Sequence, residues 1–143
     1  MAAGVKFQNF VTRKAAGVHA NALNADTDTL KVYLTNTAPN AATHQVKADL
    51  AEISGGNGYT AGGADVQNAA STSSGVITVV GTDVTWTASG GTIGPFRYVV
   101  LYNDTPTSPA DPLIQYWDYG SSITLAAGES FTTDFGASLL TDQ

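Results

Sequence analysis

The sequence predicts an all-β chain that folds as a single-domain β-sandwich of jelly-roll-like type, with one short helix at about residues 43–51. Short runs of alternating apolar and polar residues, the pattern of a strand with one buried face, recur along the chain. Turn residues separate these runs at intervals of about eight to twelve residues, as in sandwiches and barrels. Only 13% of the residues are charged. Together these observations favour a chain of short strands whose outer faces are largely neutral.

The clearest strand signals lie in residues 83–104, around which the rest of the chain is organised. Val84, Trp86 and Ala88 alternate with Thr and Ser, which predicts a strand with one face in water. Glycines and Pro95 then interrupt the pattern. Residues 96–103 follow and are apolar on nearly both faces. Such a strand belongs in the middle of a sheet, covered on both sides or pressed against a neighbouring subunit.

The remaining elements are expected in a simple order. A strand at residues 29–36 should point its even-numbered side chains inward and its odd-numbered ones outward. Thr43 suits the N-cap of the short helix that ends near residue 51. Further strands are expected at residues 65–69, 75–80, 113–119, 122–126 and 129–135, with a turn at 70–74 and a closing edge at 139–140. Tight turns at 81–82 and 127–128 predict two hairpins, one joining 75–80 to 83–89 and one joining 122–126 to 129–135.

Residues 1–24 are interpreted as an N-terminal arm that precedes a sandwich domain at residues 25–143, with residues 12–24 as either a short helix or an extended segment. Burying Phe7 and Phe10 contributes about 2 kcal/mol each. Ordering the backbone of a free arm costs roughly 1–2 kcal/mol per residue. Two phenylalanines therefore cannot hold the arm in place alone, and we expect it to be ordered only by joining a sheet or by packing on a partner.

Charge and composition exclude several classes of function. The net charge is −6, and Arg13-Lys14 is the only adjacent basic pair, so no nucleic-acid partner is expected. No run approaches the ~20 apolar residues of a membrane span, so no membrane partner is expected either. Cysteine is absent, which excludes disulfides and thiolate metal sites. Low charge and small polar residues suit surfaces that meet other proteins.

The glycine-rich residues 54–63 are the most tempting motif for a ligand. They lack the Lys-Ser/Thr of a phosphate loop, and their glycines miss the dinucleotide spacing. Residues 64–66 read as strand rather than as the helix whose N-terminus holds a phosphate. We therefore interpret the segment as a turn anchored by Tyr59, and we expect no cofactor.

No set of residues predicts catalysis or metal binding. The Asp26-Thr27-Asp28 run lacks the glycine and late glutamate of a calcium loop, and His19 and His44 stand without a third ligand. No G-x-S-x-G elbow is present. Carboxylate pairs for sugar hydrolysis can be drawn among four residues whose convergence the sequence does not indicate: Asp49, Glu52, Asp118 and Glu129. We expect the chain not to be an enzyme.

Four stretches, taken together, resemble a family of small virion structural proteins of tailed bacteriophages. They are ADTDTLKVYLTNTAP (25–39), DLAEISGGNGYTAGG (49–63), DVTWTASGGTIGPFRYVVLYND (83–104) and LIQYWDYGSS (113–122). The resemblance runs from about Asp26 to the end, and residues 1–24 depart from it most. It implies a decoration or cement protein without catalytic residues, made in the host cytoplasm and carried on the outer surface of the capsid. The implied partners are the major capsid protein and copies of the chain itself, as a trimer or dimer.

We assign five residues as candidates for contact with the capsid or with a second copy: Val5, Phe7, Phe10, Tyr59 and Tyr102. The arm is expected to contribute by strand addition or by insertion between subunits. The alternative is a host-facing adhesion module that binds glycans through exposed aromatic side chains, with Tyr59, Tyr102 and Tyr119 as candidates. A small glycosidase or esterase is the third hypothesis.

Overall fold

The computed structural model describes residues 3–19 and 27–142, and over these residues it confirms the all-β prediction with one short α-helix. The elements in chain order are β1 (Val5–Lys6), α1 (Gln8–Ala15), β2 (Leu30–Thr35), the 3₁₀ turn η2 (Lys47–Asp49), β3 (Ala64–Asp65), β4 (Ala69–Ser73), β5 (Val76–Val80), β6 (Thr85–Thr87), β7 (Ile93–Asn103), β8 (Leu113–Leu125), β9 (Ser130–Thr132) and β10 (Leu140–Asp142).

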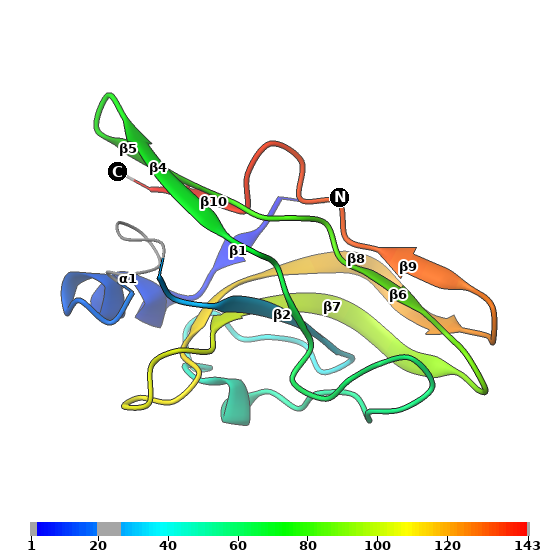
Figure 1. Cartoon of the computed structure of the whole chain (residues 1–143). Helices are drawn as coiled ribbons and strands as arrows, with labels where there is room; N and C mark the ends of the chain where they lie inside the picture. The colour runs from blue at the N-terminus through cyan, green and yellow to red at the C-terminus, as the bar shows by residue number, and fades with distance from the viewer. Residues whose placement is uncertain (1–2, 20–26, 143) are drawn as a thin grey trace.

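Within the described residues the strands form three antiparallel sheets (Figure 1). The largest has five strands in the order β1-β8-β7-β2-β3. A three-stranded sheet, β10-β5-β4, and a two-stranded sheet, β6-β9, lie above it in the view of Figure 1. The segment between β2 and β3 lies below it. The large sheet is therefore the middle of three layers.

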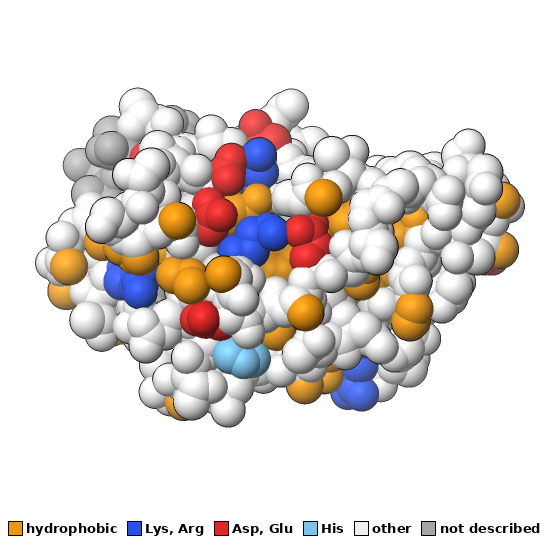
Figure 2. Space-filling view, turned by 90° about the horizontal axis from the view of Figure 1, so that it is seen from below, with side chains coloured by type: hydrophobic (Ala, Val, Ile, Leu, Met, Phe, Trp, Pro, Cys, Tyr) orange, Lys and Arg blue, Asp and Glu red, His pale blue; other side chains and the backbone are white. Residues whose placement is uncertain are grey.

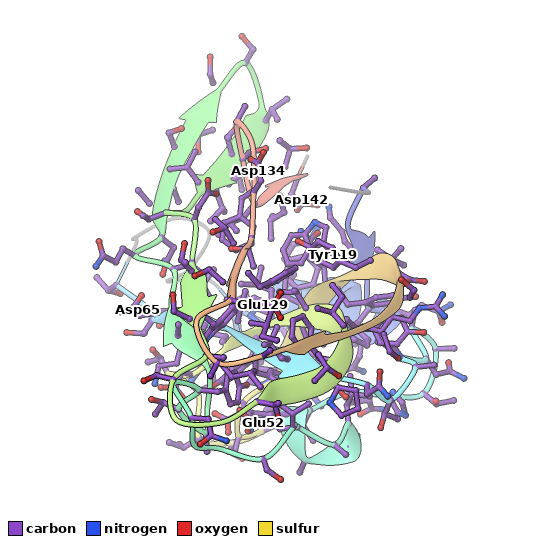
Figure 3. All side chains as sticks on the ribbon, turned by 90° about the vertical axis from the view of Figure 1, so that its right-hand side faces the viewer. Glu52, Asp65, Tyr119, Glu129, Asp134 and Asp142 are labelled. Atoms are coloured by element: carbon purple, nitrogen blue, oxygen red, sulfur yellow. The ribbon has the colours of Figure 1, made fainter. Side chains whose placement is uncertain are left out.

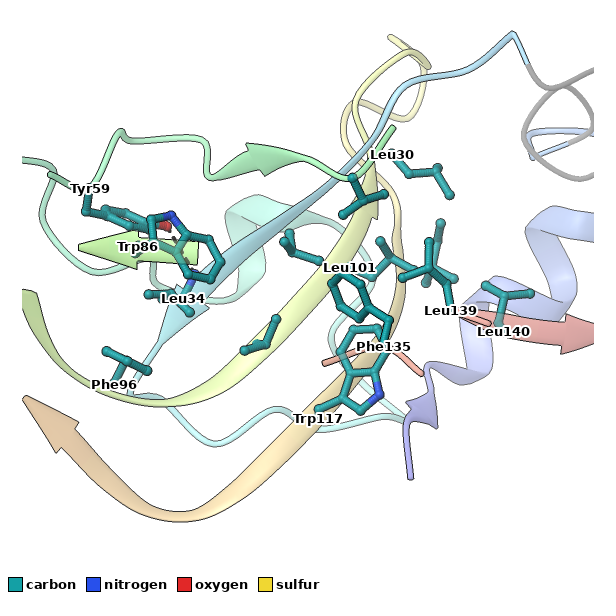
Figure 4. Close-up of a cluster of buried hydrophobic side chains, with 14 of the residues drawn as sticks. Leu30, Leu34, Tyr59, Trp86, Phe96, Leu101, Trp117, Phe135, Leu139 and Leu140 are labelled. Carbon is teal, nitrogen blue, oxygen red and sulfur yellow. Dashed lines mark hydrogen bonds between the residues drawn. The ribbon is translucent and has the colours of Figure 1, made fainter. Parts of the chain in front are cut away.

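The main hydrophobic core fills the space between the large sheet and the two smaller sheets (Figure 4). Leu101 and Trp117 of the large sheet share this cluster with Trp86 of β6 and Leu140 of β10. The ring centroids of Trp117 and Phe135 are 5.4 Å apart. Both tryptophans are buried, so they serve packing.

The expectation for residues 96–103 is confirmed, because β7 is the central strand and is buried on both faces. It pairs with β2 on one side and β8 on the other. Val99 and Leu101 belong to the main core, whereas Val100 and Tyr102 belong to a second cluster on the opposite face. Both faces of β7 are therefore covered by other residues of the same chain.

Two of the three odd-numbered residues of β2 are also buried, which corrects the expectation of an outward face. Tyr33 and Thr35 are fully buried because the segment after β2 folds back across them. The Tyr33 hydroxyl donates to the carbonyl of Leu50 at 3.3 Å, and the Thr35 hydroxyl donates to the carbonyl of Ala51. The alternating sequence pattern did not predict this burial, because tyrosine and threonine occur on exposed strand faces as well as on buried ones.

The helix lies in a different place from the predicted one. Residues 43–51 contain only the single 3₁₀ turn η2, while the α-helix is α1 in the arm. The side chain of Asp49 accepts hydrogen bonds from the backbone N–H groups of Gln45 and Val46, at 2.9 and 3.1 Å. These bonds cap a short turn and leave the segment extended on either side.

Neither predicted hairpin forms, although the strands that were expected to make them exist. β5 pairs with β4 and β10, and β6 pairs with β9. β8 continues through the predicted break at Gly120-Ser121. Residues 70–74, expected as a turn, mostly belong to β4. β10 closes an edge of the small sheet, as Leu139-Leu140 had indicated.

The described part of the arm, residues 3–19, packs on its own chain. β1 pairs with the edge of β8, placing Val5 opposite Tyr116. Phe7 then enters the cluster on one face of the large sheet, whereas Phe10 enters the main core on the other. The arm therefore wraps around the β8 edge and fills both clusters, which meets the condition that it join a sheet.

Candidate functional site

The structure places four of the five candidate contact residues inside the fold. Phe7, Phe10, Tyr59 and Tyr102 are buried, and only Val5, 44% exposed, lies on the surface. This corrects their assignment as contact residues, because their side chains are already covered by the chain's own atoms. One side of β1 pairs with β8, and β1 is the edge strand of the large sheet. A contact with another protein therefore has to use Val5 or a surface outside this set of five residues.

The candidate glycan-binding residues are not gathered on an exposed face. Tyr59 and Tyr102 are buried, and Tyr119 is half-buried against Phe131, with ring centroids 4.8 Å apart. Burial, with Asp134 and Asp83 nearby, raises the pKa of Tyr119 to about 12. The three rings therefore do not form a stacking platform for a sugar.

The four candidate carboxylates each hold a local piece of backbone or a neighbouring side chain. Asp49 caps η2, and Glu129 accepts a hydrogen bond from the Ala126 N–H at 2.7 Å. Asp118 forms a two-bond pair with Arg97, at 2.8 and 3.0 Å. Glu52 and Glu129 lie in different connecting segments and are separated in the view of Figure 3. The arrangement gives each of these carboxylates a structural partner.

Glu52 is the centre of the most connected polar network. Its Oε1 accepts hydrogen bonds from the Tyr59 hydroxyl and the Gly62 N–H, both at 2.7 Å, and its Oε2 lies 2.6 Å from Lys47 Nζ. The Lys47 ammonium also sits 5.0 Å from the ring centroid of Tyr33. The network ties the glycine-rich segment to the underside of the large sheet. Tyr59 is therefore the anchor of a turn, as the sequence indicated.

Figure 2 shows this underside, where acidic and basic side chains lie next to one another on the central part of the face. Alternating signs make short-range pairs, such as Lys47 with Glu52 and Lys31 with Asp104 at 2.9 Å. The face therefore carries no single-sign patch that would attract a nucleic acid.

The two histidines have separate structural surroundings. His44 Nδ1 accepts a hydrogen bond from the Asn40 N–H at 3.0 Å. His19 is fully buried, with Nδ1 3.4 Å from the side-chain amide of Asn103, which itself donates to Asp28 at 2.7 Å. His19 Nε2 has no hydrogen-bond partner among the described residues. Asp26, the first residue of the calcium-like run, lies outside the described residues.

A shallow hollow of about 300 Å³ lies between the arm and the C-terminal segment. Gly4, Trp117, Asp134 and Phe135 are among its lining residues. The indole and the phenyl ring are turned into the core, since both residues are buried. The hollow offers a ligand little aromatic surface.

The most distinctive surface is the projecting β4–β5 hairpin, which sequence reasoning missed (Figures 1 and 3). Four of the five β4 residues are exposed, and among the described residues no strand pairs with its outer side. Residues 66–82 contain no charged residue in a chain of net charge −6. This uncharged run is the sequence feature that could have indicated the hairpin. Its serine-rich middle is instead typical of a turn, so no strand was predicted there. We call the outer side of Ala69–Ser73 the β4 edge.

The described residues hold neither a metal-binding cluster nor a membrane-spanning helix. No group of three or more His, Asp or Glu side chains is placed to hold a metal ion in residues 3–19 and 27–142. No helix in the same residues is long and apolar enough to cross a membrane. No family model, curated protein or solved structure matches this chain.

Proposed function

We propose that this chain is a structural protein of a tailed-bacteriophage virion, and that it decorates the outer surface of the capsid by binding the major capsid protein and copies of itself. The observation that carries the proposal is the β4 edge, an exposed and uncharged strand that projects from a compact block. Such an edge offers backbone hydrogen bonds to another protein without the cost of desolvating charge. The resemblance of residues 25–39, 49–63, 83–104 and 113–122 to virion structural proteins supports the same role.

Decoration of a shell needs only modest individual contacts. Many copies sit on one particle, and subunits that also join one another gain avidity through effective concentration. A small edge contact repeated over a lattice therefore holds the protein in place. This is consistent with a chain whose large aromatic side chains are mostly used in its own core.

The test is to purify virions of the phage that encodes the chain and to count its copies against the major capsid protein by gel densitometry. Decoration predicts hundreds of copies per particle. A glycan array with the purified protein runs beside it, because the adhesion alternative predicts few copies and a sugar ligand. Absence from purified virions would contradict both roles.

A further inference from the structure

The β4 edge has a defined set of free backbone groups. Ser73 lies opposite Val76 across a two-residue turn at Ser74 and Gly75, whose φ values are 52° and 78°. A turn with two positive φ angles closes a tight hairpin, and the residues that flank it exchange hydrogen bonds. Because such pairs alternate along an antiparallel ladder, Ser71 and Ala69 also bond inward to β5. The N–H and C=O groups of Ala70 and Thr72 therefore point outward.

Nothing in the strand protects these groups. Natural edge strands are usually blocked by lysines, prolines, bulges or a covering segment. β4 has the sequence AASTS, pairs with β5 without a register shift, and has no other strand beside it in the described part of the chain. An unblocked and uncharged edge is a template for another strand.

We propose that two copies of this chain pair through the β4 edge, antiparallel and about a two-fold axis that passes beside Ser71. In this register Ala70 lies opposite Thr72 of the second copy, and Thr72 lies opposite its Ala70. Both are then hydrogen-bonded pairs, so all four outward groups of each strand are used. The two small sheets join into one continuous six-stranded sheet with the order β10-β5-β4-β4-β5-β10.

Charge favours a second copy as the occupant. Each copy carries a net charge of −6, so two copies repel one another over most of their surfaces. Residues 66–82 are neutral, so the projecting hairpin is a part of the surface where two identical chains can approach without like-charge contact. A two-fold contact is also self-complementary, since the same residues serve both sides.

Side chains on both faces of the new pair are small enough to fit. Ser71 faces Ser71 of the second copy as a non-hydrogen-bonded pair, in which Cα atoms approach to about 4.5 Å. Five residues of edge pairing bury less than a standard stable interface. The dimer is therefore weak and concentration-dependent in solution. This inference specifies the contact between copies that the proposed function includes, and its tests use the isolated chain, so it can fail while binding to the capsid stands.

The sharpest test uses the absence of cysteine from the chain. In Ser71→Cys the two new thiols lie within disulfide reach across the two-fold axis. The control Ser73→Cys also places an exposed thiol on the same strand, but its copies are four positions out of register, roughly 13 Å apart. Under mild oxidation, followed by non-reducing gel electrophoresis, Ser71→Cys should form a covalent dimer at least about tenfold faster than Ser73→Cys. Equal rates overturn the proposed register.

A second variant tests the hydrogen bonds. Thr72→Pro removes one outward N–H and leaves the inward ladder to β5 intact, whereas Thr72→Val keeps the N–H and matches the shape of threonine. Sedimentation equilibrium from micromolar to millimolar protein should show self-association for wild type and Thr72→Val, and a monomer for Thr72→Pro. Circular dichroism verifies that each variant is folded. If the wild-type chain stays monomeric at millimolar concentration, the β4 edge does not pair with a second copy and the proposal is overturned.

Discussion

The hydroxyl of Tyr59 donates a hydrogen bond to Glu52 Oε1 at 2.7 Å while accepting one from the N–H of Leu34 at 3.0 Å. A buried phenol thus joins the glycine-rich segment, the segment below the sheet and strand β2. Burial raises the pKa of Tyr59 well above its ordinary value, so the hydroxyl stays protonated and keeps its donor. The pair is a structural clamp.

Removing this hydroxyl should destabilise the fold measurably. Tyr59→Phe leaves the ring in the core but deprives Leu34 N–H and Glu52 of a buried partner, which costs about 1–3 kcal/mol. Urea unfolding measures the change. Tyr116→Phe is the matched control, because its hydroxyl has no hydrogen bond to any described residue. Equal losses in the two variants would show that the Tyr59 hydroxyl contributes nothing special.

Gly63 should be far less replaceable than Gly75, although both have nearly the same positive φ, 79° and 78°. A Cβ at Gly63 would lie 1.8 Å from the carbonyl oxygen of Val32, whereas nothing lies within 4 Å of one at Gly75. Gly75→Ala should cost only the conformational strain, roughly 1–2 kcal/mol. Gly63→Ala should cost more than about 4 kcal/mol or prevent folding. Thermal melts of similar midpoint would refute the close approach of the glycine segment to β2.

The arm should behave as part of the core. Phe7→Ala and Phe10→Ala each leave a cavity in one of the two clusters and should destabilise the chain by about 3–5 kcal/mol. Val11→Ala, at a residue of α1 that is 54% exposed, should stay within about 0.5 kcal/mol of wild type. Urea unfolding compares the three variants. Phenylalanine variants as stable as Val11→Ala would mean that the arm detaches in solution.

His19 should make the fold sensitive to mild acid. Burial, with Arg13 nearby, lowers the pKa of His19 to about 4, although Asp28 acts in the opposite direction. In the unfolded chain the imidazole titrates near its ordinary 6.5, so between these two pH values the unfolded chain binds more protons. The free energy of unfolding should therefore fall by about 3 kcal/mol from pH 6.5 to pH 4 and change no further through this group at lower pH.

His19→Gln isolates that effect, since glutamine retains a hydrogen-bonding side chain but does not titrate. Urea unfolding at a series of pH values should give a flatter curve for the variant between pH 6.5 and pH 4. Parallel curves for wild type and variant would show that the imidazole is not buried in its neutral form.

Local patterns predicted most of the strands but not their partners, and β4 was expected as a turn. The apolar run around Val99 and Leu101 indicated a central strand. A strand whose side chains are apolar on both faces is stable only where both faces are covered. The pairing of β6 with β9 joins residues that are distant in sequence, and no turn signal encodes such a contact. Tyr33 appeared exposed because the segment that covers it is polar and irregular.

The candidate site was the hardest part to predict from sequence. Phe7 and Phe10 were assigned to a partner because a short apolar arm has no visible anchor in its own sequence. The structure supplies one, since the arm wraps around the edge of β8 and reaches both faces of the sheet. The β4 edge was missed for the opposite reason: its residues are small and polar, and only the topology shows that their outer side is open.

Imaging of the intact particle tests the proposed role most directly. The proposed role predicts that virions reconstructed by cryo-electron microscopy with and without the gene for this chain differ by density at regular positions on the outside of the capsid. Fitting the chain into that density should place the projecting β4–β5 hairpin at a contact with a neighbouring subunit. Identical shells in the two reconstructions, or density confined to the tail, would contradict the assignment to capsid decoration.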